Sequence, residues 1–263
     1  MDLAKYGPWA LVIGGSEGVG AAYARKLAAA GFRLVLAARK PEPLEALAAE
    51  LRAAGAEVRT VPVDLARADA LDRVRAATDD IAVGLLIYNA GANDTRGNFV
   101  ELDPQVYRSV IAITVVGQAE FARHYGALMQ ARGRGGIILS GSLSSFLGSA
   151  TLAAYTGAKA FSRIFTEALW AECKPMGIDV LHNVIGFTDT PAMRRLGMDT
   201  SSAQPPEDVA QEALDNIANG PLLLHGGQQA RDLATQRSRL DDRAGLIATI
   251  ATPRREDIPR TKA

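Results

Sequence analysis

The sequence contains one cysteine among its 263 residues, so no disulfide can form within the chain. Such scarcity is typical of the reducing cytoplasm, where we expect the protein to act. Its three histidines, His124, His182 and His225, lack the spacing of metal ligands, and we predict no metal site. Lysine and arginine balance aspartate and glutamate at 29 each, which leaves no excess charge for binding nucleic acid or an anionic membrane.

Long hydrophobic runs are also missing, because no segment approaches the roughly 18 apolar residues of a membrane-spanning helix. The apolar run within residues 1–13 stops at Gly14 and Gly15 and is too short for a secretion signal. Hydrophobic residues nevertheless make up 48% of the chain. A chain of this length can bury roughly 70% of its surface. We expect a soluble protein with one domain over residues 1–251 and a C-terminal tail at 252–263.

Short apolar segments alternate with longer segments of helical periodicity. The predicted strands are 10–13, 33–37, 58–63, 84–88, 136–140, 178–184 and 222–225. The predicted helices are 20–30, 44–54, 68–77, 104–132, 152–173 and 206–218. This alternation predicts an α/β fold, a single-domain Rossmann-type, doubly wound parallel sheet of about seven strands with helices on both faces. Ligands of such sheets bind beyond the carboxyl ends of the strands.

A glycine-rich segment joins the first predicted strand to the first predicted helix. Three of its glycines have the spacing G-x-x-x-G-x-G. Glycines let the backbone approach a pyrophosphate, and the start of the helix offers N–H groups and the positive end of its dipole. Glycines also serve ordinary turns, so the position between strand and helix is what favours a dinucleotide here. The predicted cofactor contacts are Gly14, Ser16, Glu17, Gly18, Val19 and Gly20.

Two cations, Arg39 and Lys40, follow the second predicted strand. An acidic residue normally stands at about this position to hold the ribose 2′-hydroxyl of NAD. The arginine fork instead matches the 2′-phosphate of NADP, which a carboxylate would repel. We therefore predict NADP(H) rather than NAD, although a solvated pair before Pro41 is the alternative. Glu17 complicates this prediction, because a carboxylate in the glycine loop is expected near the same phosphate.

A tyrosine and a lysine, Tyr155 and Lys159, lie four residues apart in the predicted helix 152–173 and share one face of it. Ser142 comes thirteen residues before Tyr155, just beyond the fifth predicted strand and thus at the edge that carries the glycine loop. A phenol has a pKa near 10, and lowering it to about 7 takes roughly 4 kcal/mol of favourable interaction with the phenolate. A neighbouring ammonium and an oxidised nicotinamide can supply that interaction. The three side chains predict acid–base chemistry beside a nicotinamide.

In combination, these motifs resemble the short-chain dehydrogenase/reductase family, in its 3-ketoacyl reductase and 17β-hydroxysteroid dehydrogenase-like branch. The resemblance spans about residues 10–227. It implies an NADP-dependent oxidoreductase that transfers hydride between nicotinamide and a ketone or secondary alcohol. The branch implies a bulky lipophilic carbonyl compound, such as a ketosteroid or a ketoacyl compound.

The resemblance also implies roles for individual residues. Tyr155 would be the general acid or base, Ser142 would hold the substrate oxygen, and Lys159 would bind the nicotinamide ribose and tune Tyr155. Further cofactor contacts are implied beside the adenine, beside the adenosine ribose and at the nicotinamide end. They are Asp64 and Leu65 beside the adenine; Asn89, Ala90 and Gly91 beside the adenosine ribose; and Ile185, Gly186, Thr188 and Thr190 at the nicotinamide end.

A substrate lid is expected at about residues 187–205, where Met193, Leu196 and Met198 would line an apolar pocket or pack within the lid itself. The resemblance further implies a homo-oligomer, a dimer or tetramer, that pairs residues 104–132 and 152–173. Phe161, in the second of these helices, would suit either an interface or the core.

The chain departs from the family at the fourth catalytic position. The family has Asn in the pattern N-x-x-G, whereas this chain has Thr114 ahead of Gly117. That Asn holds a water that passes protons to the lysine, and a threonine hydroxyl is expected to hold it less well. General acid–base assistance contributes about 10²- to 10⁴-fold in rate, so a weaker relay would slow turnover. A non-catalytic or weakly active NADP-binding sensor or scaffold is therefore the alternative, with an epimerase or dehydratase of the same fold as a third.

Overall fold

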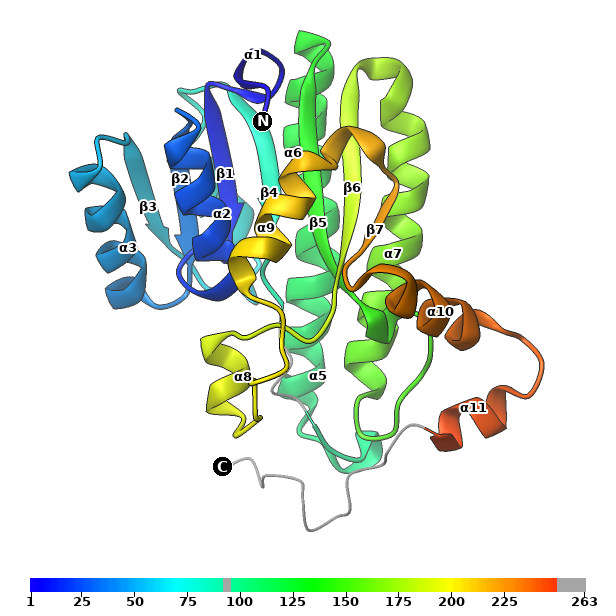
Figure 1. Ribbon diagram of the computed structural model, residues 1–263. Helices are drawn as coiled ribbons and strands as arrows, with labels where there is room; N and C mark the ends of the chain where they lie inside the picture. Colours follow the sequence, from blue (N-terminus) through cyan, green and yellow to red (C-terminus); the bar gives the residue numbers. More distant parts are fainter. Residues whose placement is uncertain (92–95, 250–263) are drawn as a thin grey trace.

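The seven strands form one parallel sheet (Figure 1). The computed structural model describes residues 1–91 and 96–249, so the predicted tail at 252–263 lies outside the described residues. The prediction of a doubly wound, Rossmann-like α/β fold is confirmed. In pairing order the strands are β3 (Val58–Pro62), β2 (Arg33–Ala38), β1 (Trp9–Ile13), β4 (Val83–Tyr88), β5 (Gly135–Ser142), β6 (Ile178–Ile185) and β7 (Leu222–Leu224).

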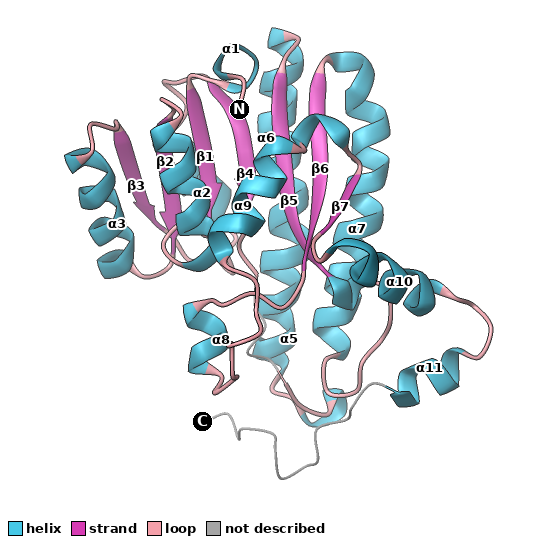
Figure 2. Cartoon of the chain, in the orientation of Figure 1, coloured by secondary structure: helices cyan, strands magenta, loops and turns pink. Residues whose placement is uncertain are grey.

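The order of the strands reverses between β1 and β4, the place at which doubly wound sheets bind their ligands. Every residue of β1 and β4 is buried. Continuously apolar strands of this kind need helices on both faces of the sheet. Figure 2 shows both layers. One layer holds α2 (Gly18–Ala29), α3 (Pro41–Ala53) and α9 (Pro206–Asp215), and the other holds α4 (Ala70–Arg75), α6 (Gln118–Arg132) and α7 (Ala153–Cys173).

Two hydrophobic cores result, one on each face of the sheet. Leu27 of α2 and Leu44 of α3 are fully buried in the first core, together with Val209 of α9. Val74 of α4 and Phe121 of α6 are buried in the second. The cores fix the strands and helices, and the loops at the strand ends remain available for a site.

The predicted helical segment 104–132 is helical throughout but is not one regular α-helix. The segment consists of α5 (Pro104–Ile111), a π-helical turn η2 (Ala112–Gly117) and then α6. The hydroxyl of Tyr88, at the end of β4, donates to the carbonyl oxygen of Ile113 at 2.7 Å. A Cβ atom on Gly117 would lie 2.3 Å from that hydroxyl. Gly117 therefore leaves room for an inserted donor that disturbs the regular helical hydrogen bonding.

Several short or polar helices were not predicted. They include α1 (Leu3–Tyr6), α8 (Pro191–Arg195), α10 (Gly227–Ser238) and α11 (Arg243–Thr249). Only Ala230 and Ala234 of α10 are buried, so its sequence carries little apolar periodicity. Figure 1 shows α10 and α11 on the side of the sheet that ends in β7.

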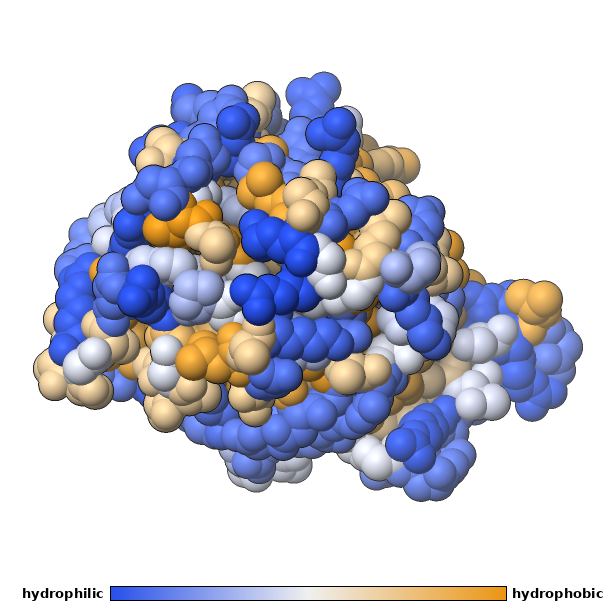
Figure 3. Space-filling view, turned by 90° about the horizontal axis from the view of Figure 1, so that it is seen from above, coloured by the Kyte–Doolittle hydropathy of each residue, from blue (hydrophilic) through white to orange (hydrophobic). Residues whose placement is uncertain are grey.

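Viewed onto the edge at which the strands begin, the surface is largely hydrophilic with scattered hydrophobic residues (Figure 3). Among residues 1–91 and 96–249, no helix has the length and apolar character that crossing a membrane requires. The opposite edge, where the strands end, carries the residues singled out in the sequence.

Candidate active site

The glycine loop turns sharply between β1 and α2. Gly14 and Gly18 have φ angles of +79° and +57°, a region in which a side chain is strained. A Cβ atom on Gly20 would lie 1.9 Å from the carbonyl oxygen of Gly14. Glu17 precedes α2 without capping it through its side chain, so the first N–H groups of the helix have no side-chain cap there. The loop therefore fits a pyrophosphate placed against its backbone.

The other predicted loop residues differ in accessibility. Ser16 is partly exposed, whereas Val19 points into the core on the α2 face of the sheet. The side chain of Val19 therefore serves packing, and only its backbone is free to face a ligand.

Asn89, directly after β4, links the glycine loop to β5. Its Nδ2 donates to the carbonyl oxygen of Gly14 at 3.5 Å, and its Oδ1 accepts a hydrogen bond of 3.0 Å from the hydroxyl of Ser140. Ala90 is partly buried, and a Cβ atom on Gly91 would lie 3.4 Å from Nζ of Lys159. The segment 89–91 thus runs from the glycine loop to the predicted catalytic lysine.

Lys159 is 4% exposed, and burial lowers its pKa to about 8. Its Nζ donates to the carbonyl oxygen of Ser140 at 2.9 Å. An ammonium group has three donors, and within residues 1–91 and 96–249 this is the one acceptor found for it. The remaining donors fit ribose hydroxyls. Sequence reasoning missed Ser140, which contacts both Asn89 and Lys159; its place two residues before Ser142, on the same face of the strand, was the available signal.

Tyr155 lies in the first turn of α7 and is partly exposed, with its ring centroid 5.9 Å from Nζ of Lys159. Ser142 is the last residue of β5 rather than a residue beyond it, because the strand continues past its predicted end. Burial raises the pKa of Tyr155, while a hydrogen bond with Ser142 and the charge of Arg96 lower it by less. In the protein alone, desolvation outweighs the favourable contacts. The predicted lowering of this pKa involves an oxidised nicotinamide beside the phenol and stays a prediction.

Thr114 lies in the π-helical turn η2 and is fully buried. Its hydroxyl finds no hydrogen-bond partner among the described residues. Buried hydroxyls are usually satisfied by protein or water. The predicted role of Thr114 in a proton relay stays a prediction.

Arg39 and Lys40 are both exposed where β2 ends, and Lys40 is the residue before α3. No ion pair of Arg39 occurs within the described part of the chain. Glu17 instead pairs with Arg195 of α8, with Nη1 of the arginine 2.9 Å from Oε2 of the carboxylate. The hydrogen bond from Arg195 is the main reason that the pKa of Glu17 is lowered, and the charge of Lys40 adds to it. The carboxylate that complicated the NADP prediction thus has a cationic partner.

Asp64 and Leu65 lie in the turn that follows β3. Oδ1 of Asp64 accepts a hydrogen bond of 3.0 Å from the backbone N–H of Ala66. Leu65 is partly buried against the core on the α4 face. Both residues are held at the sheet edge by local contacts, two strands away from β1.

The predicted lid leaves the sheet at the end of β6. Ile185 is the last residue of that strand, and the hydroxyl of Thr188 donates to the carbonyl oxygen of Gly186 at 3.2 Å. A parallel bridge between Thr188 and Gln204 closes the base of the lid. The hydroxyl of Thr190 accepts from a backbone N–H in the first turn of α8 and so caps that helix.

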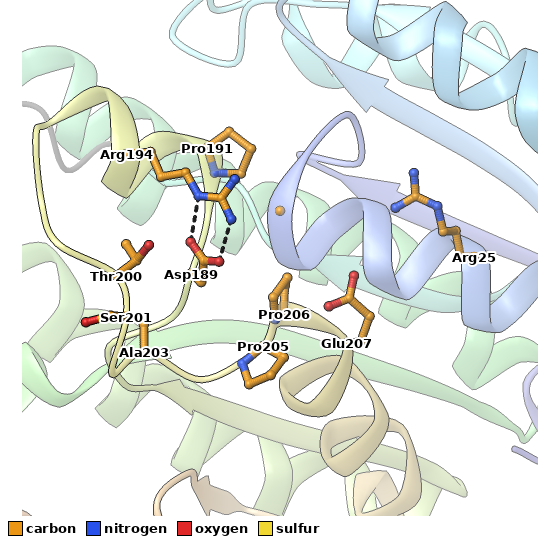
Figure 4. Close-up of a pocket in the computed structure, with 11 residues that line it drawn as sticks. Arg25, Asp189, Pro191, Arg194, Thr200, Ser201, Ala203, Pro205, Pro206 and Glu207 are labelled. Atoms are coloured by element: carbon orange, nitrogen blue, oxygen red, sulfur yellow. Dashed lines mark hydrogen bonds and ion pairs between the residues drawn. The ribbon is translucent and has the colours of Figure 1, made fainter.

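A cavity of about 550 Å³ lies between the first turn of α2, the predicted lid and the start of α9 (Figure 4). It borders the glycine loop at Gly18, but its lining does not include Ser142, Tyr155 or Lys159. The catalytic candidates therefore lie outside this cavity. Its lining residues are Gly18, Arg25, Asp189, Pro191, Arg194, Thr200, Ser201, Ala203, Pro205, Pro206 and Glu207.

Two curated relatives are similar over most of the chain. A 7beta-hydroxysteroid dehydrogenase of Clostridium sardiniense is 31% identical over 251 residues, covering 94% of this chain and 95% of the relative. A very-long-chain 3-oxoacyl-CoA reductase of Neurospora crassa is 31% identical over 218 residues, covering 81% of this chain and 65% of the relative.

Solved structures agree with these relatives. A structure described as giving insights into 7beta-hydroxysteroid dehydrogenase stereoselectivity has a TM-score of 0.85 at 28% identity, covering 94% of this chain and 97% of that one. A short-chain dehydrogenase from Sphingobium yanoikuyae in complex with NADPH has a TM-score of 0.79 at 28% identity, covering 97% and 98% of the two chains. The sequence model described as short chain dehydrogenase matches residues 8–201, a span that runs from β1 into the predicted lid. With that match, the chain belongs to the short-chain dehydrogenase family of oxidoreductases.

Proposed function

We propose that the protein is an NADP(H)-dependent reductase that interconverts a ketone and a secondary alcohol, with Tyr155 as its general acid. The observation that carries the proposal is the position of Tyr155, Ser142 and Lys159 at the sheet edge that also carries the glycine loop. This arrangement of an acid, a hydrogen-bond donor and a cation supports a role for all three beside one bound dinucleotide.

The steps follow from the chemistry of these side chains. The nicotinamide, when bound, supplies or accepts the hydride. Ser142 donates a hydrogen bond to the carbonyl oxygen, and Tyr155 gives its proton to that oxygen as it becomes a hydroxyl. Lys159 binds the nicotinamide ribose, and its positive charge stabilises the phenolate that Tyr155 becomes. Burial raises the pKa of Tyr155 in the protein alone, so the side chain is a phenol that carries the proton which reduction consumes.

The choice of NADP over NAD rests on Arg39 and Lys40, two exposed cations at the end of β2. A guanidinium fork and an ammonium favour the 2′-phosphate through charge-assisted hydrogen bonds. A similar solved short-chain dehydrogenase carries NADPH. NADP(H) is accordingly the cofactor we propose, with NAD as the weaker ligand.

A bulky lipophilic carbonyl compound is the substrate class we propose. Two curated relatives carry the names of a hydroxysteroid dehydrogenase and a very-long-chain oxoacyl reductase. In this chain the predicted lid exposes apolar side chains: Phe187 is 40% and Met198 is 47% exposed. Such side chains at the site edge suit an apolar substrate that covers them on binding.

A homo-oligomer is also part of the proposal. Large apolar side chains are exposed along α5, η2 and α7, and Phe161 stacks on Phe165 with ring centroids 5.4 Å apart. This row would be covered by pairing with a second copy of the chain. We expect light scattering to give the mass of a dimer or tetramer, and a purely monomeric mass would contradict the expectation. The exposed residues are Ile111, Val116, Phe161 and Ile164.

The decisive experiment is an activity screen of ketosteroids, 3-ketoacyl esters and aryl ketones with NADPH and with NADH. We expect oxidation of NADPH that depends on the ketone, and slower oxidation of NADH. Binding of NADPH with no oxidation across the whole panel would instead favour a sensor or scaffold. A strong preference for NADH would contradict the argument from Arg39.

A further inference from the structure

An ion pair joins the predicted lid to the glycine loop. Arg195 of α8 and Glu17 are 178 residues apart in sequence, and Nη1 of the arginine lies 2.9 Å from Oε2 of the carboxylate. Nη2 of the same arginine donates to Oε1, so the pair is bidentate. Two parallel bonds of this kind fix orientation as well as distance. The position of α8 over the glycine loop therefore depends on specific side chains.

Packing supports the same placement of the lid. A Cβ atom on Gly18 would lie 3.1 Å from Cγ2 of Thr190 and 3.8 Å from Cδ of Pro191. Figure 4 shows Pro191 facing the first turn of α2. The start of α8 thus lies against the loop that we propose binds the pyrophosphate.

Glu17 is a carboxylate in a loop that has to accept phosphate groups. An unpaired carboxylate there would repel a bound dinucleotide phosphate, and solvent screens the repulsion only in part. The guanidinium of Arg195 balances that charge, and the side chain of Glu17 is only 33% exposed. Arg195 is therefore placed both to hold the lid and to cancel an unfavourable charge.

We propose that Arg195 is a positioning residue for the cofactor: its bidentate pair with Glu17 holds the lid over the glycine loop and offsets the repulsion between Glu17 and the cofactor phosphates. This inference rests on the proposed function. The two effects of the pair are separable, because loss of either partner removes this tie between lid and loop, whereas only loss of Arg195 leaves the Glu17 carboxylate without its bidentate partner.

The neighbouring residue provides a matched control. Arg194 lies on the same helix and also forms a bidentate pair, with Nε 2.8 Å from Oδ1 of Asp189. That pair, drawn in Figure 4, lies wholly within the predicted lid and does not reach the glycine loop. The side chains of Arg194 and Arg195 are 63% and 49% exposed. Each arginine thus forms a bidentate pair with a carboxylate, and of these two pairs only that of Arg195 joins the lid to the loop.

The experiment compares NADPH binding by the wild type with that of Arg195→Gln, Glu17→Gln, the double variant and Arg194→Gln. Equilibrium titration gives the Kd, and stopped-flow displacement gives the dissociation rate. We expect NADPH to leave Arg195→Gln and Glu17→Gln roughly two- to fivefold faster, the range for one exposed ion pair. The Kd for NADPH should rise about fivefold or more in Arg195→Gln and change less in Glu17→Gln. The Kd of the double variant should equal that of Glu17→Gln. Arg194→Gln should match the wild type.

Equal effects of Arg194→Gln and Arg195→Gln would overturn the proposal, and so would a double variant that binds as weakly as Arg195→Gln. If Arg195→Gln does not fold, Arg195→Lys takes its place, because it keeps the charge and loses the fork. Its Kd should be higher than that of the wild type by less than about fivefold, and a Kd equal to that of the wild type would contradict the role of the bidentate pair. A wild type that binds no nicotinamide dinucleotide would overturn the proposed function, and this inference with it. A wild type that binds NADPH without the predicted variant pattern would overturn only the inference.

Discussion

The starts of α2 and α7 lie at the same edge of the sheet but contribute to the site in opposite ways. α2 offers backbone: Gly18 has a φ of +57°, and Gly20 leaves no space for a Cβ atom. α7 offers side chains, a phenol whose pKa burial raises and an ammonium whose pKa burial lowers to about 8. At the start of α2, the lack of space for side-chain atoms determines which residues are tolerated. At the start of α7, the determining quantity is the free-energy cost of burying a charged group. A substitution should therefore harm α2 by adding atoms and α7 by removing a functional group.

The largest effect is expected in the side-chain region. Tyr155→Phe removes the proton donor and should lower kcat for ketone reduction by about 10²- to 10⁴-fold. Its Kd for NADPH should stay near that of the wild type, because α2 supplies the phosphate contacts. Parallel measurement of turnover and cofactor binding checks both points. A variant that keeps most of its activity would show that α7 does not supply the acid.

Gly20→Ala should damage the backbone region. The added Cβ atom would lie 1.9 Å from the carbonyl oxygen of Gly14, so the loop must shift. We expect a loss of about 1–3 kcal/mol in the free energy of unfolding, as for an overpacked core, and a weaker Kd for NADPH. Urea denaturation and cofactor titration measure the two effects. Unchanged binding would contradict the argument that space limits this region.

Lys159→Met should separate function from stability. The pKa of Lys159 falls from an ordinary value of 10.5 to about 8 on folding, so between these pH values the unfolded chain binds more protons. The stability of the wild type therefore rises with pH through this window, and at pH 7 the buried ammonium costs up to about 3 kcal/mol. The variant should be inactive yet more stable than the wild type at pH 7, and this advantage should shrink towards pH 10. Denaturation at both pH values checks the sign, and a less stable variant at pH 7 would contradict it.

The smallest effect is expected for Gly157→Ala, a change inside α7 that adds the same methyl group as Gly20→Ala. Gly157 is exposed, and a Cβ atom there would meet nothing within 4 Å. Alanine in a helix interior is favoured over glycine by about 0.5–1 kcal/mol. We expect a gain of that size in the free energy of unfolding, with NADPH binding unchanged. A loss of stability would mean that space limits α7 as well.

The same contrast explains how far the sequence alone predicts this structure. The strands are apolar runs and the glycine loop is a local spacing, so both follow from neighbouring residues. The π-helical turn depends on a hydroxyl from Tyr88 meeting Ile113, a contact across 25 residues that no periodicity reveals. The pair of Arg195 with Glu17 is likewise long-range, and a dipeptide of two arginines gives no sign of its partners.

The balance of effects on the pKa of Tyr155 is hidden from the sequence for a related reason. The distance of four residues to Lys159 is visible in the sequence, whereas the desolvation of the phenol depends on how the whole site closes around it. Helix α10 was missed because it buries little, so its periodicity is weak. Local chemistry was therefore predictable, and the balance between burial and charge was not.

The central claim is that Tyr155 faces a nicotinamide held by the glycine loop, and a crystal structure of the protein with NADP⁺ tests it most directly. We expect the pyrophosphate against residues 14–20, the nicotinamide ribose on Nζ of Lys159, and the hydroxyl of Tyr155 beside the nicotinamide ring. A dinucleotide bound elsewhere, or a Tyr155 hydroxyl directed away from the ring, would contradict it.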